Sequence, residues 1–432
     1  MRYTRFLLVT IMVTMIATFA WASGRGEAAP GGITQLEFWT PTDVGMYGEW
    51  IEAFEDENPD VRINLVAHPW NDYWTKLPLS LRTGDGPDLF FQHIAFLENS
   101  IPHAAPYARE LMNYNELQDR FDLVQENKVD GNVYYLPLAT MGSSIFYDRE
   151  LLSAAGVSQI PDTWDEFLAL ARELTVTDGS GQVTRAGFSF NGMQRELNWA
   201  LGYQNGMPIF NADGLSTIAS AQAQEVLAYL MNIYREEGVG SMLMAGNAWD
   251  QFASGRAAMV YVNGWVYGWM ADNAPNMEFG VAPIPSLDGN PPAFDRNNVE
   301  LMIGVSRYTD AAKADAGQRF VNFILNHADF LVDFAIRKGG IPTRFDLRAD
   351  PRITSHPLVS VALQTYDRTV YPGGFPVAIE PGYNRLFENI FLNNMPIPQA
   401  VVIAEREINQ AIRNTGFVPV EDQYAYFHEF NF

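Results

Sequence analysis

The sequence contains no cysteine among its 432 residues. It therefore has no disulfide framework, no thiol nucleophile and no thiolate metal site. The same absence excludes a membrane tether through an acylated N-terminal cysteine, so the exported chain is expected to carry no lipid.

Long apolar runs are also scarce. The one that stands out covers residues 6–20, follows two arginines and ends in the small-residue pattern Ala20-Trp21-Ala22. This layout predicts a signal peptide over residues 1–22 and a mature chain in the periplasm or outside the cell. An uncleaved anchor is the weaker alternative, because a spanning helix needs about 20 apolar residues. Residues 23–32, rich in glycine and alanine, predict a flexible leader.

Basic residues are few: 28 lysines and arginines face 51 carboxylates, which gives a net charge of −23. This balance argues against nucleic acid and anionic membranes as partners, since both require basic patches. The roughly 400 remaining residues exceed what one core usually holds, so two domains are expected.

Catalytic and metal-binding signatures are missing as well. There is no G-x-S-x-G, H-E-x-x-H or G-x-x-x-x-G-K pattern, and the six histidines are scattered without ligand spacing. We expect neither a metal nor a cofactor. Paired carboxylates cannot identify a glycosidase in so acidic a chain. A secreted carbohydrate hydrolase nevertheless remains an alternative, because 13% aromatic residues suit sugar stacking in either class.

Hydrophobic periodicity predicts alternating strands and helices. Residues 35–39 and 61–65 alternate as strands, and residues 88–92 follow a turn as a third strand. Between the first two, Tyr47, Trp50, Ile51 and Phe54 have the spacing of an amphipathic helix. Strand, helix, strand in this order predicts parallel pairing and an α/β fold.

The second half of the chain continues the alternation. Thr163 and Glu166 have capping-box spacing at the start of a helix, and a second apolar stripe covers residues 226–234. Further elements are expected as strands over 257–262 and 277–282, and as a helix over 311–325.

Six segments, in order along the chain, resemble the extracellular solute-binding proteins of the maltodextrin-binding type. They are FEDENPDV (54–61), GDGPDLF (84–90), DGNVYYLP with SIFYDRELL (130–137 and 144–152), AGV with PDTWDEF (155–157 and 161–167), FASGRAAM with GW (252–259 and 264–265) and GGIPTR (339–344). Each is weak alone, but together they span most of the mature chain.

The resemblance implies a type II periplasmic-binding-protein fold, in which a ligand cleft lies between two α/β lobes joined by hinge crossovers. We expect an N-terminal lobe of residues 33–138 plus 280–331 and a C-terminal lobe of residues 139–279 plus 332–432. The crossings are expected near 135–142, 279–285 and 333–340.

The same resemblance, with position at strand ends, suggests ligand-binding residues. Trp265 is the foremost, because its Gly-x-Trp context is similar to the place where the family stacks an indole on a sugar ring. The crossover lacks the carboxylate that relatives place there, which argues against a charged or fully maltose-like ligand. The other candidates are Trp39, Thr40, Gln92, His93, Thr140, Met141, Gly142, Asn191, Trp199, Gly340, Arg344 and Tyr383. For Trp39, Asn191, Trp199, Arg344 and Tyr383, plain packing or a surface position remains an alternative.

The leading hypothesis is a monomeric, non-catalytic receptor that captures a sugar or small oligosaccharide for the membrane permease subunits of an ABC importer. A secreted hydrolase is the alternative, and new reducing ends after incubation with glycans would distinguish it.

Overall fold

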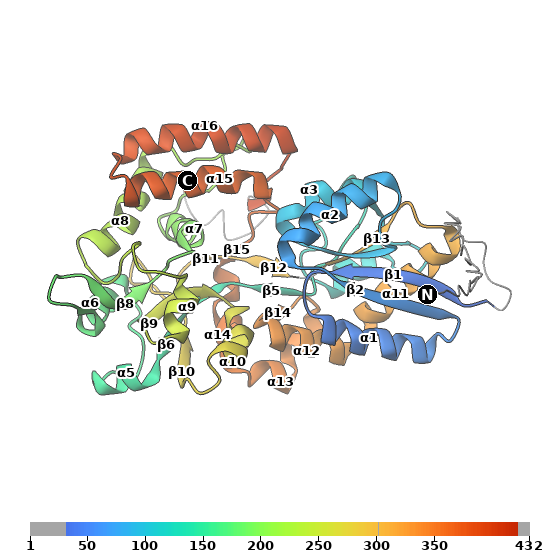
Figure 1. The fold of residues 1–432 in the computed structure, drawn as a ribbon, viewed down its shortest axis with the longest axis horizontal. Helices are drawn as coiled ribbons and strands as arrows, with labels where there is room; N and C mark the ends of the chain where they lie inside the picture. Colours follow the sequence, from blue (N-terminus) through green and yellow to red (C-terminus); the bar gives the residue numbers. More distant parts are fainter. Residues whose placement is uncertain (1–31, 301, 422–432) are drawn as a thin grey trace, which may run out of the picture.

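The protein folds into two lobes that lie side by side along its long axis (Figure 1). The structure, a computed structural model, describes residues 32–300 and 302–421. We call the lobes lobe 1, which holds the first strands of the chain, and lobe 2.

Lobe 1 is built on a five-stranded sheet of order β2-β1-β3-β13-β4. β1 pairs in parallel with β2 and β3, as the sequence predicts, whereas β13 runs antiparallel to β3 and β4. The strands are β1 (Thr34–Thr40), β2 (Val61–Ala67), β3 (Leu89–Gln92), β4 (Ala104–Ala105) and β13 (Met302–Ser306).

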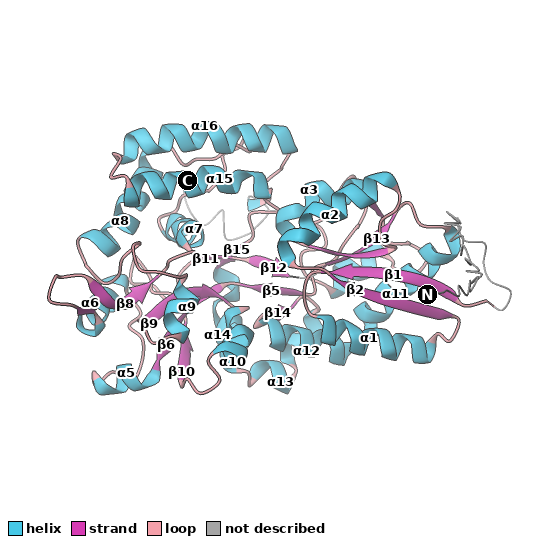
Figure 2. Cartoon of the chain, viewed as in Figure 1, coloured by secondary structure: helices cyan, strands magenta, loops and turns pink. Residues whose placement is uncertain are grey.

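Helices cover this sheet (Figure 2). The predicted stripe of Tyr47, Trp50, Ile51 and Phe54 is buried, and Phe54 meets Phe320 edge to face at 5.2 Å, which fixes α1 against α11. The helices of lobe 1 are α1 (Val44–Glu57), α2 (Trp70–Thr83), α3 (Leu97–Ser100), α4 (Tyr114–Arg120), α11 (Ala311–Asn326) and α12 (Ala328–Lys338), with 3-10 turns η1 (Ile94–Phe96) and η2 (Ile101–His103).

Lobe 2 contains a second sheet of order β10-β6-β9-β8-β7. Thr163 caps α6 as predicted, since its hydroxyl accepts a hydrogen bond from the Glu166 amide at 3.4 Å. The strands are β6 (Ser143–Asp148), β7 (Val176–Thr177), β8 (Val183–Ser189), β9 (Ala257–Asn263) and β10 (Phe279–Ala282). The helices are α5 (Arg149–Ala154), α6 (Trp164–Leu174), α7 (Gln194–Gln204), α8 (Ala221–Arg235), α9 (Ala248–Ala253), α10 (Val266–Asn273), α15 (Glu380–Phe387) and α16 (Ile397–Thr415), with η5 (Val377–Ile379) and the π-helical turn η6 (Glu388–Leu392).

Three strands from distant parts of the chain form a small sheet between the lobes, which we call the crossover sheet. Its central strand β5 pairs antiparallel with β12 and with β14. The strands are β5 (Ala139–Met141), β12 (Asn298–Glu300) and β14 (Ile341–Pro342). Beside it, β11 (Asp295–Arg296) pairs with β15 (Thr369–Val370), and the chain between β14 and β15 forms η3 (Phe345–Ala349), α13 (Pro351–Thr354), α14 (Pro357–Thr365) and η4 (Tyr366–Arg368).

The packing corrects two expected lobe boundaries. Residues 280–282 belong to β10, which pairs with β6 in lobe 2, so the second crossing follows later, at β11 and β12. Residues 332–338 complete α12, whose Val332, Phe334 and Ala335 are buried in the core of lobe 1. Ile353 and Val359 join the same core, so lobe 1 extends well past residue 331. The first expected crossing, 135–142, contains β5.

In the part of the chain that the structure describes, no helix has the length and apolarity needed to span a bilayer. The predicted signal peptide over residues 1–22 and residues 23–31 of the predicted leader lie outside the described residues.

Candidate ligand-binding site

The carboxyl ends of β1 and β2 point toward the crossover sheet and lobe 2 (Figure 1). His93 follows β3 directly and interacts electrostatically with Arg195 on α7 and with Arg296 on β11. The end of the parallel strands in lobe 1 therefore faces lobe 2, the position where open α/β sheets bind ligands.

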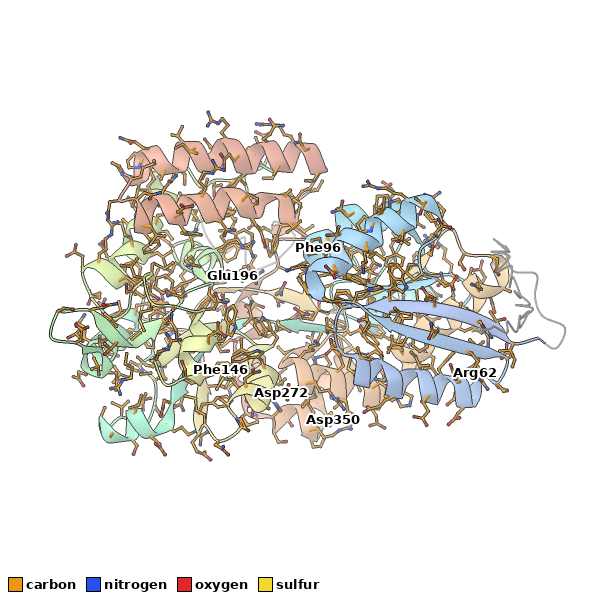
Figure 3. All side chains as sticks on the ribbon, viewed as in Figure 1. Arg62, Phe96, Phe146, Glu196, Asp272 and Asp350 are labelled. Atoms are coloured by element: carbon orange, nitrogen blue, oxygen red, sulfur yellow. The ribbon has the colours of Figure 1, made fainter. Side chains whose placement is uncertain are left out.

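The first turn of α7 supplies charged side chains on the lobe 2 side. Arg195 pairs with Glu196 at 2.6 Å and with Glu380 at 3.0 Å, and its guanidinium lies 4.8 Å from the Phe375 ring and 5.6 Å from the Trp199 ring. Burial opposes ionisation of Glu196, but attraction by Arg195 and Arg296 outweighs it, and the pKa of Glu196 is lowered. Figure 3 shows Glu196 in lobe 2 and Phe96 in lobe 1 on the sides of the two lobes that face each other.

Between the lobes, the second crossing carries buried polar side chains that lack hydrogen-bond partners among the described residues. Arg296 and Asn297 are each 2% exposed, and Asn298 is 8% exposed. The unpaired atoms are Nε and Nη1 of Arg296, both amide atoms of Asn297 and Oδ1 of Asn298. On the neighbouring strand β5, the hydroxyl of Thr140 is also buried and unpaired. Such groups are costly unless something bonds them.

Lobe 1 presents aromatic rings around His93. Trp70, which is 41% exposed, has its ring 5.4 Å from that of His93, and Trp74 stacks on Phe96 at 4.0 Å. Burial, and then the positive charges of Lys338, Arg296 and Arg195, lower the pKa of His93 to about 4. Its Nδ1 accepts a hydrogen bond from the Ala95 amide at 3.2 Å, as a neutral imidazole can.

A further charged group lies where α12 ends. Lys338 pairs with Asp43 at 2.6 Å, and both interact with Glu300 on β12. Burial raises the pKa of Glu300 to about 7; Lys338 and Arg296 lower it, and Asp43 raises it. The side chain of Glu300 accepts a hydrogen bond from the side-chain amide of Asn298 at 3.4 Å.

Two half-buried indoles of lobe 2 lie at helix starts. Trp265 immediately precedes α10, and its ring meets that of Trp249 edge to face at 5.2 Å. Gly264, next to Trp265, approaches Gly339 so closely that a Cβ atom on Gly264 would collide with the Gly339 carbonyl. Trp265 therefore lies near Lys338, at the junction of the lobes.

The profile of the bacterial extracellular solute-binding protein family matches residues 40–329. This chain belongs to that family. Among curated relatives of this solute-binding protein, a putative binding protein of Brucella abortus is 24% identical over 337 residues, 76% of this chain and 78% of the relative. The arabinooligosaccharide-binding protein of Halalkalibacterium halodurans is 24% identical over 280 residues, 60% of each chain.

Solved structures show the same two-lobed fold. The maltose/maltodextrin-binding domain from Bdellovibrio bacteriovorus, bound to maltotriose, matches with a TM-score of 0.73 at 17% identity and covers 88% of this chain and 100% of that one. A cyclic alpha-maltosyl-1,6-maltose binding protein from Arthrobacter globiformis matches with a TM-score of 0.72 at 18% identity, over 89% and 100% of the chains. These matches confirm the predicted fold class.

The solute-binding protein brings several predicted site residues to the region between its lobes. Four of them lie at or beside the groups described above: His93, Thr140, Trp199 and Trp265. Trp199 is fully buried, so its role is limited to packing against Arg195. Trp39 is half-buried at the end of β1, where its ring meets His68 at 4.5 Å and its indole donates to Glu37.

Other candidates are engaged in internal contacts. Gln92 is fully buried, donates to the Tyr134 carbonyl at 3.3 Å and accepts from Ser100 at 2.9 Å, so it belongs to the lobe 1 interior. Asn191 bonds Tyr234 and the Ser241 carbonyl. Arg344 bonds Asp346, with which it forms an ion pair.

The remaining candidates apart from Gly142 are buried in the protein interior. Tyr383 is 1% exposed within the lobe 2 core, Met141 is likewise buried, and the Thr40 hydroxyl donates to the Thr42 carbonyl at 2.7 Å. Gly340 packs against β5, since a Cβ atom there would lie 2.8 Å from the Thr140 carbonyl oxygen.

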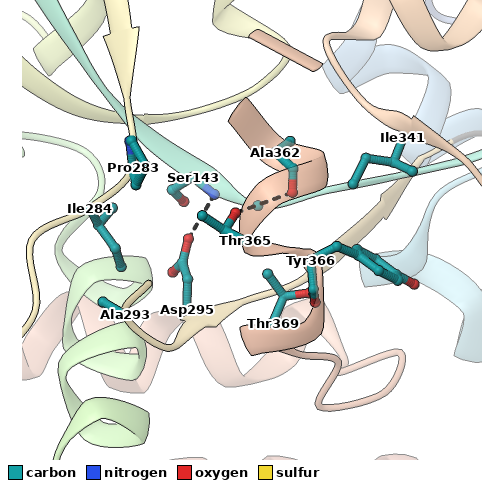
Figure 4. Close-up of a pocket in the computed structure, with 11 residues that line it drawn as sticks. Ser143, Pro283, Ile284, Ala293, Asp295, Ile341, Ala362, Thr365, Tyr366 and Thr369 are labelled. Carbon is teal, nitrogen blue, oxygen red and sulfur yellow. Dashed lines mark hydrogen bonds between the residues drawn. The ribbon is translucent and has the colours of Figure 1, made fainter. Parts of the chain in front are cut away.

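Gly142 lines a small cavity, which Figure 4 shows with Ser143, Asp295 and Thr369 among its lining residues. The cavity measures about 10 Å³, room for about one water and far too little for a sugar. Asp295 lines it and accepts hydrogen bonds from the Ser143 amide at 2.8 Å and the Tyr261 hydroxyl at 2.9 Å. Burial raises the pKa of Asp295 to about 6.

Sequence reasoning missed the charged and amide groups at the centre of the site. Arg195 and Glu196 stand between two residues that were singled out, Asn191 and Trp199, but nothing in the pattern indicates that they are buried. Arg296 and Asn297 occupy a polar stretch without alternation, which reveals neither strand nor crossover.

Proposed function

We propose that this protein is the extracytoplasmic receptor of an ABC importer, which captures a sugar or small oligosaccharide between its lobes and delivers it to the permease. The observation that supports this most directly is the set of buried, unpaired polar groups on the second crossing. Ligand hydroxyls both donate and accept hydrogen bonds, so a sugar suits such a set.

Aromatic side chains around the polar groups support the same ligand class. Trp70 and His93 on lobe 1, and Trp249 and Trp265 on lobe 2, offer flat apolar faces beside polar groups. This combination matches the two sides of a sugar ring. The relative from Halalkalibacterium halodurans is named for an arabinooligosaccharide, and several structural neighbours contain maltodextrins.

The unpaired groups also give a reason for ligand-dependent closure. Bringing the lobes together over Arg296 and Asn297 without a partner costs about 1–3 kcal/mol for each group left unbonded. A ligand that bonds these groups removes the cost, so it favours the closed arrangement and shifts the population toward it.

We further propose that the mature chain begins near Ser23, acts as a periplasmic or secreted monomer and has no catalytic role. The family supports the last point, because the relatives reported above are named as binding proteins. N-terminal sequencing of exported protein tests the cleavage site, and a reducing-end assay on glycans tests for hydrolysis.

A thermal-shift screen over monosaccharides, oligosaccharides and polyols, with calorimetry on every hit, tests the proposal. A ligand at about 100 times its dissociation constant should stabilise the protein by about 2.7 kcal/mol. Asn297→Ala should weaken a true ligand, whereas Gln410→Ala, on the exposed face of α16, should not. No stabilisation by any sugar or polyol would contradict the proposed function.

A further inference from the structure

The unpaired groups on the second crossing include both donors and acceptors. Nε and Nη1 of Arg296 can only donate, Oδ1 of Asn298 can only accept, and Asn297 contributes one of each. Exchanging the two amide atoms of Asn297 leaves this balance unchanged. A carboxylate or phosphate accepts but does not donate, so it would leave the amide oxygens unbonded, whereas hydroxyl groups can bond all of them.

The cations of the site are already balanced by carboxylates. Arg195 pairs with Glu196 and Glu380, and Lys338 pairs with Asp43. His93 adds no charge near neutral pH, since burial lowers its pKa to about 4.

Arg296 forms no ion pair within the described chain, but three carboxyl groups act on it electrostatically. They lie on three elements: Glu196 on α7, Asp295 beside Arg296 on β11, and Glu300 on β12. A ligand anion that approached Arg296 would therefore meet negative charge in a poorly solvated place, where like charges repel strongly.

We propose that the site selects uncharged, hydroxylated ligands and rejects sugars that carry a carboxylate or a phosphate. This inference rests on the proposed function and goes further, because it assigns the selection to Arg296–Asn298 as hydroxyl-bonding groups and to Glu196 and Glu300 as the groups that repel anions. Arg296 then donates hydrogen bonds to neutral oxygen atoms of the ligand, although a buried arginine would otherwise suggest that the ligand is an anion.

Neutral and charged sugars, including one pair matched in shape, test the selection. For each hexose that stabilises the protein, calorimetry compares it with its hexuronate, the neutral hexuronamide and the hexose 6-phosphate. The uronamide has the shape of the uronate without its charge, so it serves as the steric control. We expect the uronate and the phosphate to bind at least about 30-fold more weakly than the uronamide, because opposed like charges at a buried contact cost several kcal/mol.

Two isosteric variants test the assignment of the repelling groups. With calorimetry carried out well above pH 7, where Glu300 is ionised, Glu300→Gln and Glu196→Gln should each narrow the gap between uronamide and uronate by about tenfold, since each removes one repelling charge near Arg296, worth about 1.4 kcal/mol. Glu52→Gln, on the exposed face of α1, should leave the gap unchanged.

The outcomes are distinguishable. Equal or tighter binding of the uronate or phosphate overturns the inference and leaves the proposed function standing. A gap that persists unchanged in both glutamine variants also overturns it, because the carboxylates would then not be its cause. Failure of every sugar, neutral or charged, to bind contradicts the proposed function itself and this inference with it.

Discussion

Trp265 offers the most direct test of the site at the level of one residue. The ring is half-buried and contacts Trp249, so one part of it is held by packing and another part is free to contact a ligand. If that face stacks on the ligand, Trp265→Ala should cost about 2 kcal/mol of binding, a loss of about 30-fold in affinity by calorimetry.

Trp164 provides the control for this substitution. It is 1% exposed in the lobe 2 core, so Trp164→Ala should cost about 3–5 kcal/mol of stability and leave the affinity of the folded fraction unchanged. A Trp265→Ala protein that is strongly destabilised yet binds normally when folded would contradict the ligand contact. It would show that Trp265, like Trp164, is a core residue.

Glu300 gives a pH-dependent prediction. Burial raises the pKa of its carboxyl in the folded protein to about 7, above the ordinary value of 4.5, so the folded state holds the proton more tightly than the unfolded chain. The resulting stabilisation is fully present below pH 4.5 and is lost as the pH rises through about 7.

The free energy of unfolding should therefore fall relative to Glu300→Gln across this window, by up to about 3 kcal/mol at 1.36 kcal/mol per pKa unit. Urea unfolding of both proteins from pH 4 to pH 8 measures the difference between their free energies of unfolding. The other titrating groups are the same in both proteins, so their contributions cancel in this difference. A difference that stays flat with pH would contradict the burial of this carboxyl.

The sequence predicted part of this site because strand ends and short motifs are visible in it. His93, Thr140 and Trp265 were singled out in this way and lie in the region between the lobes, and their contact with ligand remains a prediction. Arg195, Arg296 and Asn297 were not, because their importance lies in burial between segments far apart in the chain, which local periodicity does not reveal. Gln92 was misplaced for the converse reason: it ends a strand, but its side chain turns inward to Ser100 and Tyr134.

At the level of elements, the close approach of Gly264 to Gly339 at the junction of the lobes can be tested by substitution. A Cβ atom on Gly264 would collide with the Gly339 carbonyl, where β9 leads into α10 against the end of α12. Gly264→Ala should cost about 1–3 kcal/mol of stability, as overpacking does, and weaken ligand binding by displacing Trp265. Gly179→Ala, in an exposed turn with open space around the glycine, should leave both the melting temperature and the affinity unchanged.

Elements with strong periodicity or caps were predicted well. α11 covers residues 311–326 against the expected 311–325, α6 begins directly after Thr163 as the capping-box spacing predicted, and β1 and β9 cover their predicted strands. The crossover sheet was not foreseen beyond β5, since β12 and β14 have three and two residues and are held by pairing with β5 rather than by their own pattern.

For the whole molecule, ligand should draw the lobes together about the crossover sheet. Solution scattering should give a smaller radius of gyration with a saturating ligand from the screen than without it, because the bound ligand bonds the unpaired polar groups between the lobes. Asn297→Ala at the same ligand concentration should show a smaller decrease. An unchanged radius at saturation would contradict hinge closure.

The order of strands in lobe 1 has a consequence for how the chain acquires its structure. β13 lies between β3 and β4 in the sheet, yet it begins at Met302, while β3 ends at Gln92. Lobe 1 therefore cannot complete its sheet until most of the polypeptide has been synthesised. The part of lobe 2 that lies between β3 and β13 in the sequence is an insertion in lobe 1. Contacts so remote in sequence slow folding, because loop-closure entropy is lost before they form. Slow folding keeps a newly synthesised chain unfolded for longer. The unfolded chain is the form in which an exported polypeptide can pass through a membrane.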